Sequence, residues 1–318
     1  MNIQGTVILT PIYNDWDSFQ QLLNDIDKTL LDVVENVVVF AINDGSTSPV
    51  TFNVNNEYRS IQKVEILHLS RNVGHQRAIA IGLAYLENNI RPSRVIIMDA
   101  DGEDAPADIP ALIAEEERTK NIVFARRGQR REGLWFKFYY SVYRFLFFML
   151  TGQKINFGNF CIIPGTVLRQ IVLLPEIWGH FASGVLRSGL PHHAIMIDRR
   201  KRYQGKSKMN FVSLVMHGLS AFSVYTDIMS VRLILFTLLV ILVVFVSGIG
   251  LMYVKYFTNL AIPGWATTVG LGLVMILLQA FILLLSLIFN MLNSKSSQAY
   301  TPARYFEDYL LKVETIYG

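Results

Sequence analysis

Two long runs without a charged residue constrain most strongly how this chain can fold. They are Leu233–Val254 and Tyr256–Ser294. Each contains a stretch of roughly 20 apolar residues, which is the length that crosses the ~30 Å hydrocarbon core of a bilayer. Pro263, Gly264 and Trp265 mark an interface before the second stretch. We therefore predict two transmembrane helices within 231–294, at about 232–256 and 265–292.

The composition agrees with a membrane-anchored chain that also carries a folded domain. Of the 318 residues, 52% are hydrophobic and 17% are charged, and the mean hydropathy is +0.34. This is too apolar for an ordinary soluble protein, and the apolar residues concentrate after position 230. The apolar run Thr6–Ile12 is too short for a secretory signal. The single cysteine, Cys161, excludes an intrachain disulfide and fits a reducing compartment.

The basic residues predict how the two spans are oriented. Lysines and arginines crowd before the first span and follow the second, at Lys295, Arg304 and Lys312, whereas the connection 257–263 carries no charge. Positively charged flanks stay on the cytoplasmic side of a membrane. We predict that the domain 1–209 and the tail 295–318 both face the cytoplasm. An amphipathic juxtamembrane helix is expected at 210–230, before the first span.

Short apolar runs alternate with helical patterns in the N-terminal half. We predict strands at Thr6–Ile12, Val37–Ile42, Val64–Leu69, Val95–Met98 and Ile122–Ala125. Proline cannot donate to a sheet ladder, so Pro11 is expected to stop the first strand from continuing. Strands that alternate with helices predict an α/β domain built on a mostly parallel, Rossmann-like sheet.

The fourth predicted strand ends in a cluster of acidic residues: Asp99, Asp101, Glu103 and Asp104. Because open α/β sheets bind ligands at the carboxyl ends of their strands, these carboxylates and Asp44 after the second strand would meet at one edge. An Asp-x-Asp pair there can chelate a hard divalent cation whose shell a nucleotide diphosphate completes. The alternative is a solvated loop in which Asp108 caps the next helix.

Four sequence blocks follow one another in a specific order: Pro11-x-Tyr13-Asn14-Asp15, Asp44-Gly45-Ser46-Thr47, Arg71-Asn72-x-Gly74-His75 and Asp99-Ala100-Asp101. This order resembles the family 2 glycosyltransferases of the GT-A fold. It is most similar to the membrane-anchored polyprenyl-phosphate glycosyltransferases, which include dolichol-phosphate mannose synthases and bactoprenol glucosyltransferases. The resemblance implies a multi-pass protein of the bacterial inner (plasma) membrane with a cytoplasmic GT-A domain, a Mg²⁺ or Mn²⁺ cofactor, and a homo-oligomer, since relatives form tetramers.

The resemblance also implies roles for individual residues. The nucleotide-sugar pocket would include Pro11, Tyr13, Asp15 and Gly74, with Asp44 on the base or ribose. Asp99 and Asp101 would hold the donor diphosphate and its metal ion. Glu103 stands where relatives often have a glutamine that also touches the metal. Two interpretations of His75 remain open: a donor-site residue, or a polar residue near a helix start.

Two basic groups lie in the middle of the chain. The first includes Arg126, Arg127 and Arg131 and precedes an aromatic-rich stretch, 134–150, that suits an interfacial helix. The second includes Arg202, Lys206, Ser207 and Lys208. We expect these residues to bind the acceptor phosphate, since arginines clamp phosphate and relatives carry a similar Gly-x-Ser-Lys element. The alternative is a solvated face against anionic lipid. With a net charge of only +4 and spans nearby, nucleic acid is not an expected partner.

One residue departs from the pattern of the relatives. They typically carry Gly-Asp-Phe in mid-domain, with the aspartate as the proposed base, whereas this chain has Gly158-Asn159-Phe160. An amide cannot accept a proton at neutral pH. A phosphate monoester, with a second pKa of about 6, is largely dianionic at pH 7 and can attack without a base. Asn159 therefore favours a phosphate acceptor over a sugar hydroxyl.

The sequence thus predicts a metal-dependent, inverting glycosyltransferase. The expected donor is a nucleotide diphosphate sugar, with UDP favoured, and the expected acceptor is undecaprenyl phosphate or a similar lipid. The first alternative is a membrane glycosyltransferase that adds a sugar to a hydroxyl of a lipid-linked glycan or polysaccharide. The second is a non-catalytic membrane scaffold that keeps the fold. Asp99, Asp101 and Asn159 are the expected catalytic residues, and Asp99, Asp101 and Glu103 the expected metal ligands.

Overall fold

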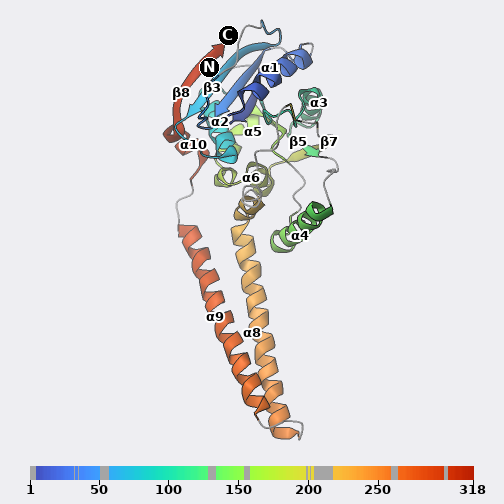
Figure 1. Ribbon diagram of the computed structural model, residues 1–318, viewed down its shortest axis with the longest axis vertical. Helices are drawn as coiled ribbons and strands as arrows, with labels where there is room; N and C mark the ends of the chain where they lie inside the picture. Colours follow the sequence, from blue (N-terminus) through green and yellow to red (C-terminus); the bar gives the residue numbers. More distant parts are fainter. Residues whose placement is uncertain are drawn as a thin grey trace. The chain divides into compact units, whose positions relative to one another are not determined.

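The computed structural model describes residues 5–31, 33–34, 36–50, 57–127, 134–153, 158–197, 200, 202–203, 218–258, 264–296 and 300–318. The chain divides into two units, and Figure 1 labels their elements. The first unit comprises residues 1–137, 155–224 and 299–318; the second comprises residues 138–154 and 225–298. The chain therefore leaves the first unit twice, at residues 138 and 225, and returns to it each time.

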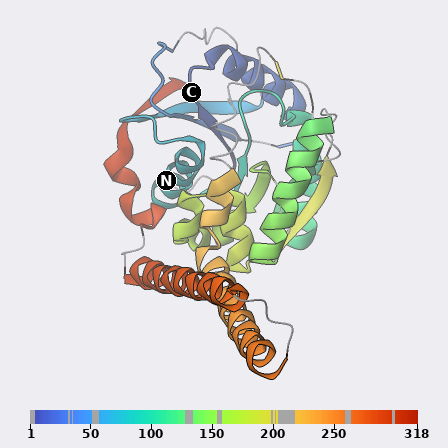
Figure 2. The same ribbon diagram turned by 60° about the horizontal axis from the view of Figure 1, so that its bottom comes forward.

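An eight-stranded sheet forms the centre of the first unit, in the order β7-β5-β6-β4-β1-β2-β3-β8. Its parallel block consists of β1 (Thr6–Ile12), β2 (Val37–Asn43), β3 (Ile61–Leu69) and β4 (Arg94–Ile97). β6 (Cys161–Pro164) runs antiparallel to β4 and to β5 (Ile122–Arg127), which pairs in parallel with β7 (His192–Ile197). Figure 2 shows β7 in yellow and the β8 segment in red on opposite sides of the unit. The predicted α/β class with a mostly parallel sheet is confirmed.

Helices cover both faces of the sheet because alternate residues of each buried strand point to opposite faces. Val7 and Leu9 pack in one core with residues of α2 (His75–Asn89), α5 (Gly165–Val172) and α6 (Phe181–Ser188). Ile8 packs in the other core with α1 (Trp16–Leu30) and α3 (Ile109–Thr119). The short η1 (Pro106–Asp108) and η2 (Pro175–Trp178) precede α3 and α6. Burial on both faces explains why β1, β2 and β4 read as continuous apolar runs.

The first strand has its predicted bounds, and Pro11 lies inside it, one residue before its end. β1 continues through Pro11 to Ile12, where it still pairs with β2. The neighbour on the other side, β4, pairs with β1 only as far as Leu9 and Ile97. The amide groups of a strand alternate between its two neighbours, and Leu9 faces the β4 side, since its carbonyl accepts the N–H of Met98 at 3.2 Å. Pro11 therefore faces the side where β4 has ended, and its missing N–H leaves no ladder bond unmade.

The end of the chain, which the sequence predicted only as a cytoplasmic tail, contains helices and a strand. Residues 295–318 contain α10 (Pro302–Tyr305), η3 (Phe306–Tyr309) and β8 (Leu310–Tyr317). β8 runs antiparallel to β3 and forms the edge of the sheet. None of its residues is buried, so it lacks the buried apolar pattern from which the other strands were predicted.

The second unit contains α8 (Thr226–Phe257), α9 (Trp265–Ser296) and most of α4 (Leu134–Thr151). α8 and α9 run side by side, as Figure 1 shows. Thr226–Phe257 and Trp265–Asn293 contain 18-residue windows with mean hydropathies of 2.9 and 2.8, and both helices are long and apolar enough to cross a membrane. The two predicted spans are therefore confirmed as apolar helices. α4 covers the predicted interfacial helix 134–150. Of the predicted juxtamembrane helix, residues 210–217 lie outside the described residues.

Candidate active site

Asp44 joins two loops at the carboxyl edge of the sheet. It follows β2 directly and is buried, with 3% of its surface exposed. Its Oδ1 accepts the N–H of Val73 at 2.7 Å and its Oδ2 accepts the N–H of Gly74 at 3.0 Å. Burial raises the pKa of this carboxyl, and the two amide hydrogen bonds oppose that rise only in part. Both oxygens of Asp44 thus hold the loop that leads into α2, and its expected contact with a base or ribose stays a prediction.

Hydrogen bonds of Asn14 connect the loops that follow β1 and β2. Asn14, at a positive φ of 52°, accepts the N–H groups of Thr47 and Ser48 through Oδ1, each at 2.9 Å. The N–H of Asn14 donates to Ser46 Oγ at 3.0 Å. These hydrogen bonds hold the loop after β1 at the same edge of the sheet as Asp44. That loop carries the predicted nucleoside-pocket residues Pro11, Tyr13 and Asp15. Tyr13 is 45% exposed there, as a ring that stacks on a base would be.

The acidic stretch after β4 forms a tight loop rather than a solvated one. The buried Asp104 accepts the N–H of Asp99 through Oδ2 at 3.0 Å. Asp101 Oδ1 accepts the N–H of Glu103 at 2.9 Å. Gly102 lies at the turn with a φ of 84°, a conformation that glycine adopts without strain. Asp108, the alternative N-cap of α3, makes no side-chain capping bond. The loop therefore holds Asp99, Asp101 and Glu103 at the carboxyl edge.

His75 lies between Asp99 and Asn159. His75 Nε2 lies 3.3 Å from Asp99 Oδ1 and 3.0 Å from Asn159 Nδ2. Burial disfavours the charged imidazole, but the carboxylates of Asp99, Asp104 and Asp44 outweigh it and raise the pKa of His75. His75 is also the first residue of α2, so both interpretations of His75 stay predictions. The structure also brings together Asn159 and Asp99, which the sequence predicted as catalytic residues.

Arg202 lies at the acidic loop. Its guanidinium pairs with Asp101 Oδ2, and its Nε lies 4.0 Å from Glu103 Oε1. The next residue, Tyr203, donates its N–H to the carbonyl of Asp101 at 2.9 Å and its hydroxyl to Asp25 at 2.7 Å. Burial and the neighbouring Asp25 raise the pKa of Tyr203. Arg202, predicted at the acceptor phosphate, therefore stands beside the expected metal ligands.

The structure describes only some of the other residues that were predicted to bind the acceptor phosphate. Arg126 is exposed near the end of β5, and the backbone of Arg127 ends that strand. Arg131, Lys206, Ser207 and Lys208 lie outside the described residues. Their expected role at the acceptor phosphate stays a prediction.

The acidic loop suits a divalent ion that arrives together with a diphosphate. Among the described residues, no three His, Cys, Asp or Glu side chains form a ligand set by themselves. Mg²⁺ is commonly bound by one or two carboxylates plus substrate phosphates, so such a set is not required. Asp101 and Glu103 are 13% and 16% exposed and already hold a cation, the Arg202 guanidinium. Their oxygens therefore fit Mg²⁺ or Mn²⁺ by charge and by ligand type.

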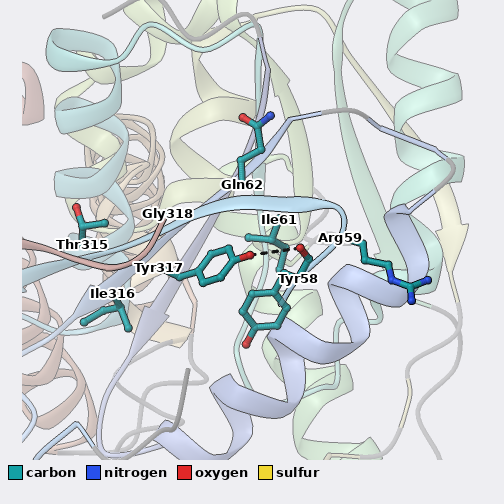
Figure 3. A pocket seen from close by; sticks show the side chains of 8 residues that line it. All are labelled: Tyr58, Arg59, Ile61, Gln62, Thr315, Ile316, Tyr317 and Gly318. Atoms are coloured by element: carbon teal, nitrogen blue, oxygen red, sulfur yellow. Dashed lines mark hydrogen bonds between the residues drawn. The ribbon is translucent and has the colours of Figure 1, made fainter. Parts of the chain in front are cut away.

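A shallow cavity lies at the opposite end of β3, away from the acidic loop. Its lining includes Tyr58, Gln62 and Tyr317, which come from the start of β3 and the end of the chain (Figure 3). The hydroxyl of Tyr317 donates to the carbonyl of Tyr58 at 3.3 Å. None of the sequence-predicted site residues lines it.

The order of these loops matches one protein family. A family model described as Glycosyl transferase family 2 covers residues 7–178, which is more than half of the chain. The chain belongs to glycosyl transferase family 2. The matched region contains Asp44, His75, Asp99 and Asn159, so the loops described above are family 2 loops. The expected membership in the family 2 glycosyltransferases is confirmed, and the protein is a glycosyltransferase.

Several curated relatives are similar over most of the chain. An uncharacterized glycosyltransferase of Synechocystis is 29% identical over 70% of this chain and 70% of its own. An undecaprenyl-phosphate 4-deoxy-4-formamido-L-arabinose transferase of Proteus mirabilis is 24% identical over 67% of this chain and 65% of its own. A dodecaprenyl-phosphate galacturonate synthase of Rhizobium johnstonii is 25% identical over 70% and 65%.

Solved structures show a weaker likeness. A glucosyl-3-phosphoglycerate synthase of Mycobacterium tuberculosis, solved with Mn²⁺, UDP-glucose and phosphoglyceric acid, has a TM-score of 0.49 and 13% identity. The alignment covers 71% of this chain and 80% of that one.

Proposed function

We propose that this glycosyltransferase moves a sugar from a nucleotide diphosphate sugar, UDP-linked in our favoured version, to a polyprenyl phosphate. The observation that carries the proposal is the amide of Asn159 beside Asp99 and His75, at the position where relatives carry their proposed base. A general base contributes about 10²–10⁴-fold to the attack of a hydroxyl. A dianionic phosphate needs no base, and an amide adds no negative charge that would repel it. Two relatives whose names include a prenyl phosphate support the same acceptor class.

The donor side of the proposed reaction rests on Asp99, Asp101 and Glu103. Asp99 and Asp101 would bind the donor diphosphate through a Mg²⁺ or Mn²⁺ ion, with Glu103 as a further ligand. That ion, when bound, would neutralise the negative charge that develops on the departing diphosphate. Arg202 would leave Asp101 as the metal and diphosphate enter, because a guanidinium and a divalent ion compete for the same oxygens. The freed guanidinium is then available to a phosphate, as the sequence predicted.

The course of the chain supports a site at the cytoplasmic membrane surface. Chain segments on both sides of α8 and α9 belong to the first unit, and β8 pairs within its sheet. Two spans between such segments return the chain to the side it left. Lys295, Arg304 and Lys312 after the second helix and the uncharged connection 257–263 agree with the cytoplasm as that side. A lipid acceptor would then present its phosphate where the catalytic unit is anchored.

The proposed function is tested with the purified full-length protein in lipid nanodiscs. Radiolabelled UDP-sugars are mixed with undecaprenyl phosphate or with undecaprenol, each with and without EDTA. We expect a labelled lipid with the phosphate acceptor only, and loss of that product in EDTA that added Mg²⁺ or Mn²⁺ restores. Absence of a metal-dependent product on the phosphate would refute the proposal.

A second candidate function, transfer to a hydroxyl of a lipid-linked glycan, is favoured by one observation. His75 is oriented by Asp99, with 3.3 Å between Nε2 and Oδ1, and an imidazole held in this way can serve as a general base. In that case His75→Gln would abolish transfer to a hydroxyl acceptor. This function would be identified if the radiolabelled sugar were found on a glycan and not on polyprenyl phosphate.

A further inference from the structure

A chain of three amide groups leads from the start of α6 to Asn159. The backbone N–H of Phe181 donates to Gln76 Oε1 at 2.6 Å. Gln76 Nε2 then donates to Asn159 Oδ1 at 3.3 Å. Asn159 Nδ2 lies 3.0 Å from His75 Nε2. Gln76 is buried, with 8% of its surface exposed, and joins segments that are 83 and 105 positions away in the sequence.

The direction of this chain of bonds is fixed at its beginning. The oxygen and nitrogen of a side-chain amide are ordinarily interchangeable, and only their partners decide which way the amide points. A backbone N–H can only donate, so the Phe181 N–H requires the oxygen of Gln76. The NH₂ of Gln76 must then face Asn159, which requires the oxygen of Asn159. The NH₂ of Asn159 is left facing His75, whose Nε2 also pairs with Asp99.

We propose that Gln76 is a positioning residue that holds the Asn159 amide with its NH₂ toward the reaction centre, where it donates a hydrogen bond to the phosphate of the acceptor. This inference rests on the proposed function and adds a determinant of acceptor class to it. His75 Nε2 also faces Asp99 Oδ1, and an NH₂ carries two hydrogens, so Asn159 keeps at least one of them for a phosphate oxygen. A reversed amide would present a carbonyl oxygen and repel the same phosphate.

Gln76→Glu separates this role from a purely structural one. A glutamate still accepts the N–H of Phe181, so the start of α6 keeps its partner. It cannot donate to Asn159 when ionised, and the Asn159 amide then turns its NH₂ toward the new carboxylate. Gln76→Met is the complementary variant, because it has a similar volume but makes neither hydrogen bond. Gln62→Glu, the same chemical change in the cavity of Figure 3, is the matched control.

The experiment measures transfer to undecaprenyl phosphate, donor affinity and melting temperature for the full-length variants. For Gln76→Glu we expect the KM for undecaprenyl phosphate to rise roughly tenfold to a hundredfold, since a hydrogen bond to a charged group is lost. Donor affinity should stay within about twofold, and Gln62→Glu should match the wild type. The Gln76→Glu effect should also disappear in an Asn159→Ala background, because no amide then remains to be oriented.

Two results would overturn the positioning role. One is a Gln76→Glu enzyme with the wild-type KM for the acceptor, while Gln76→Met is impaired, as expected if Gln76 merely supports α6. The other is a full Gln76→Glu effect on the Asn159→Ala background. A wild-type enzyme that uses undecaprenol but not undecaprenyl phosphate would instead refute the proposed function, and with it the phosphate that Asn159 is said to contact.

Discussion

Single side chains that accept backbone N–H groups shape the candidate site. Asp44 holds Val73 and Gly74, and Asp104 holds Asp99. Each bond ties the end of a strand to a loop that carries a site residue. An oxygen in such a position cannot be replaced by an NH₂ group without leaving a buried N–H unsatisfied. The site is therefore sensitive to substitutions that hardly change side-chain volume.

Asp44→Asn tests this sensitivity. The amide retains one oxygen, so one of the N–H groups of Val73 and Gly74 loses its acceptor. We expect a loss of stability of about 1–3 kcal/mol and a marked loss of donor affinity, because the loop before α2 loosens. The measurements are thermal unfolding and UDP-sugar binding.

Asp27→Asn is the matched control for that variant. Asp27 Oδ1 accepts the N–H groups of Arg59 and Ser60 at 2.8 and 2.7 Å, in a loop that precedes β3. Because both bonds end on the same oxygen, which the asparagine amide retains, this variant should keep the stability and the donor affinity of the wild type. Equal losses of donor affinity in the two variants would contradict a specific role for the loop that Asp44 holds.

Gly102→Ala tests the turn between Asp101 and Glu103. A Cβ at Gly102 would lie 2.6 Å from the ring of Tyr203, and its φ is 84°. Gly189→Ala is the control, because its φ is 73° but a Cβ would meet nothing within 4 Å. Both variants should lose about 1 kcal/mol from backbone strain. Only Gly102→Ala should also lose activity, measured as the KM for the donor. Equal activity in the two variants would show that contact with Tyr203 is unimportant.

At the scale of helices and strands, the sequence predicted only the features that leave a local pattern of residues. β1 to β5 were found because each contains a short apolar run that is followed by turn or charged residues. The meeting of Asp44 and the acidic loop at one edge follows from the parallel order of β1, β2 and β4. β8 was missed because none of its residues is buried and its partner β3 is far away in the sequence. The pairing of Arg202 with Asp101, 101 positions apart, and the bonds of Gln76 likewise leave no local pattern.

Deletion of residues 310–318 tests the contribution of β8. The deletion exposes the backbone edge of β3 and removes the pairing of His68 Nε2 with Glu314 Oε2 at 3.1 Å. We expect a melting temperature lower by several degrees and a tendency to aggregate, as for other exposed sheet edges. Deletion of Gly318 alone is the control. An unchanged melting temperature in the longer deletion would mean that β8 adds little to the sheet.

At the scale of the whole molecule, one chain combines a family 2 sheet with two apolar helices inserted before its last strand. Because β8 follows α9 and pairs with β3, segments of the first unit precede and follow the apolar helices in the sequence. A domain anchored in this way stays at the membrane, which is the place where a polyprenyl phosphate is found. The proposed acceptor and the anchor are therefore consistent with each other, and the nature of the acceptor is the central claim.

Asn159→Asp tests that claim most directly. Turnover is measured with undecaprenyl phosphate for the wild-type and the variant enzymes, at saturating donor and equal protein. A carboxylate at this position keeps the bond from Gln76 but repels the acceptor phosphate, so we predict that kcat/KM for the lipid falls by about tenfold or more. A rise in turnover by orders of magnitude would show that the reaction needs a base, and would contradict the account of a base-free attack by a phosphate.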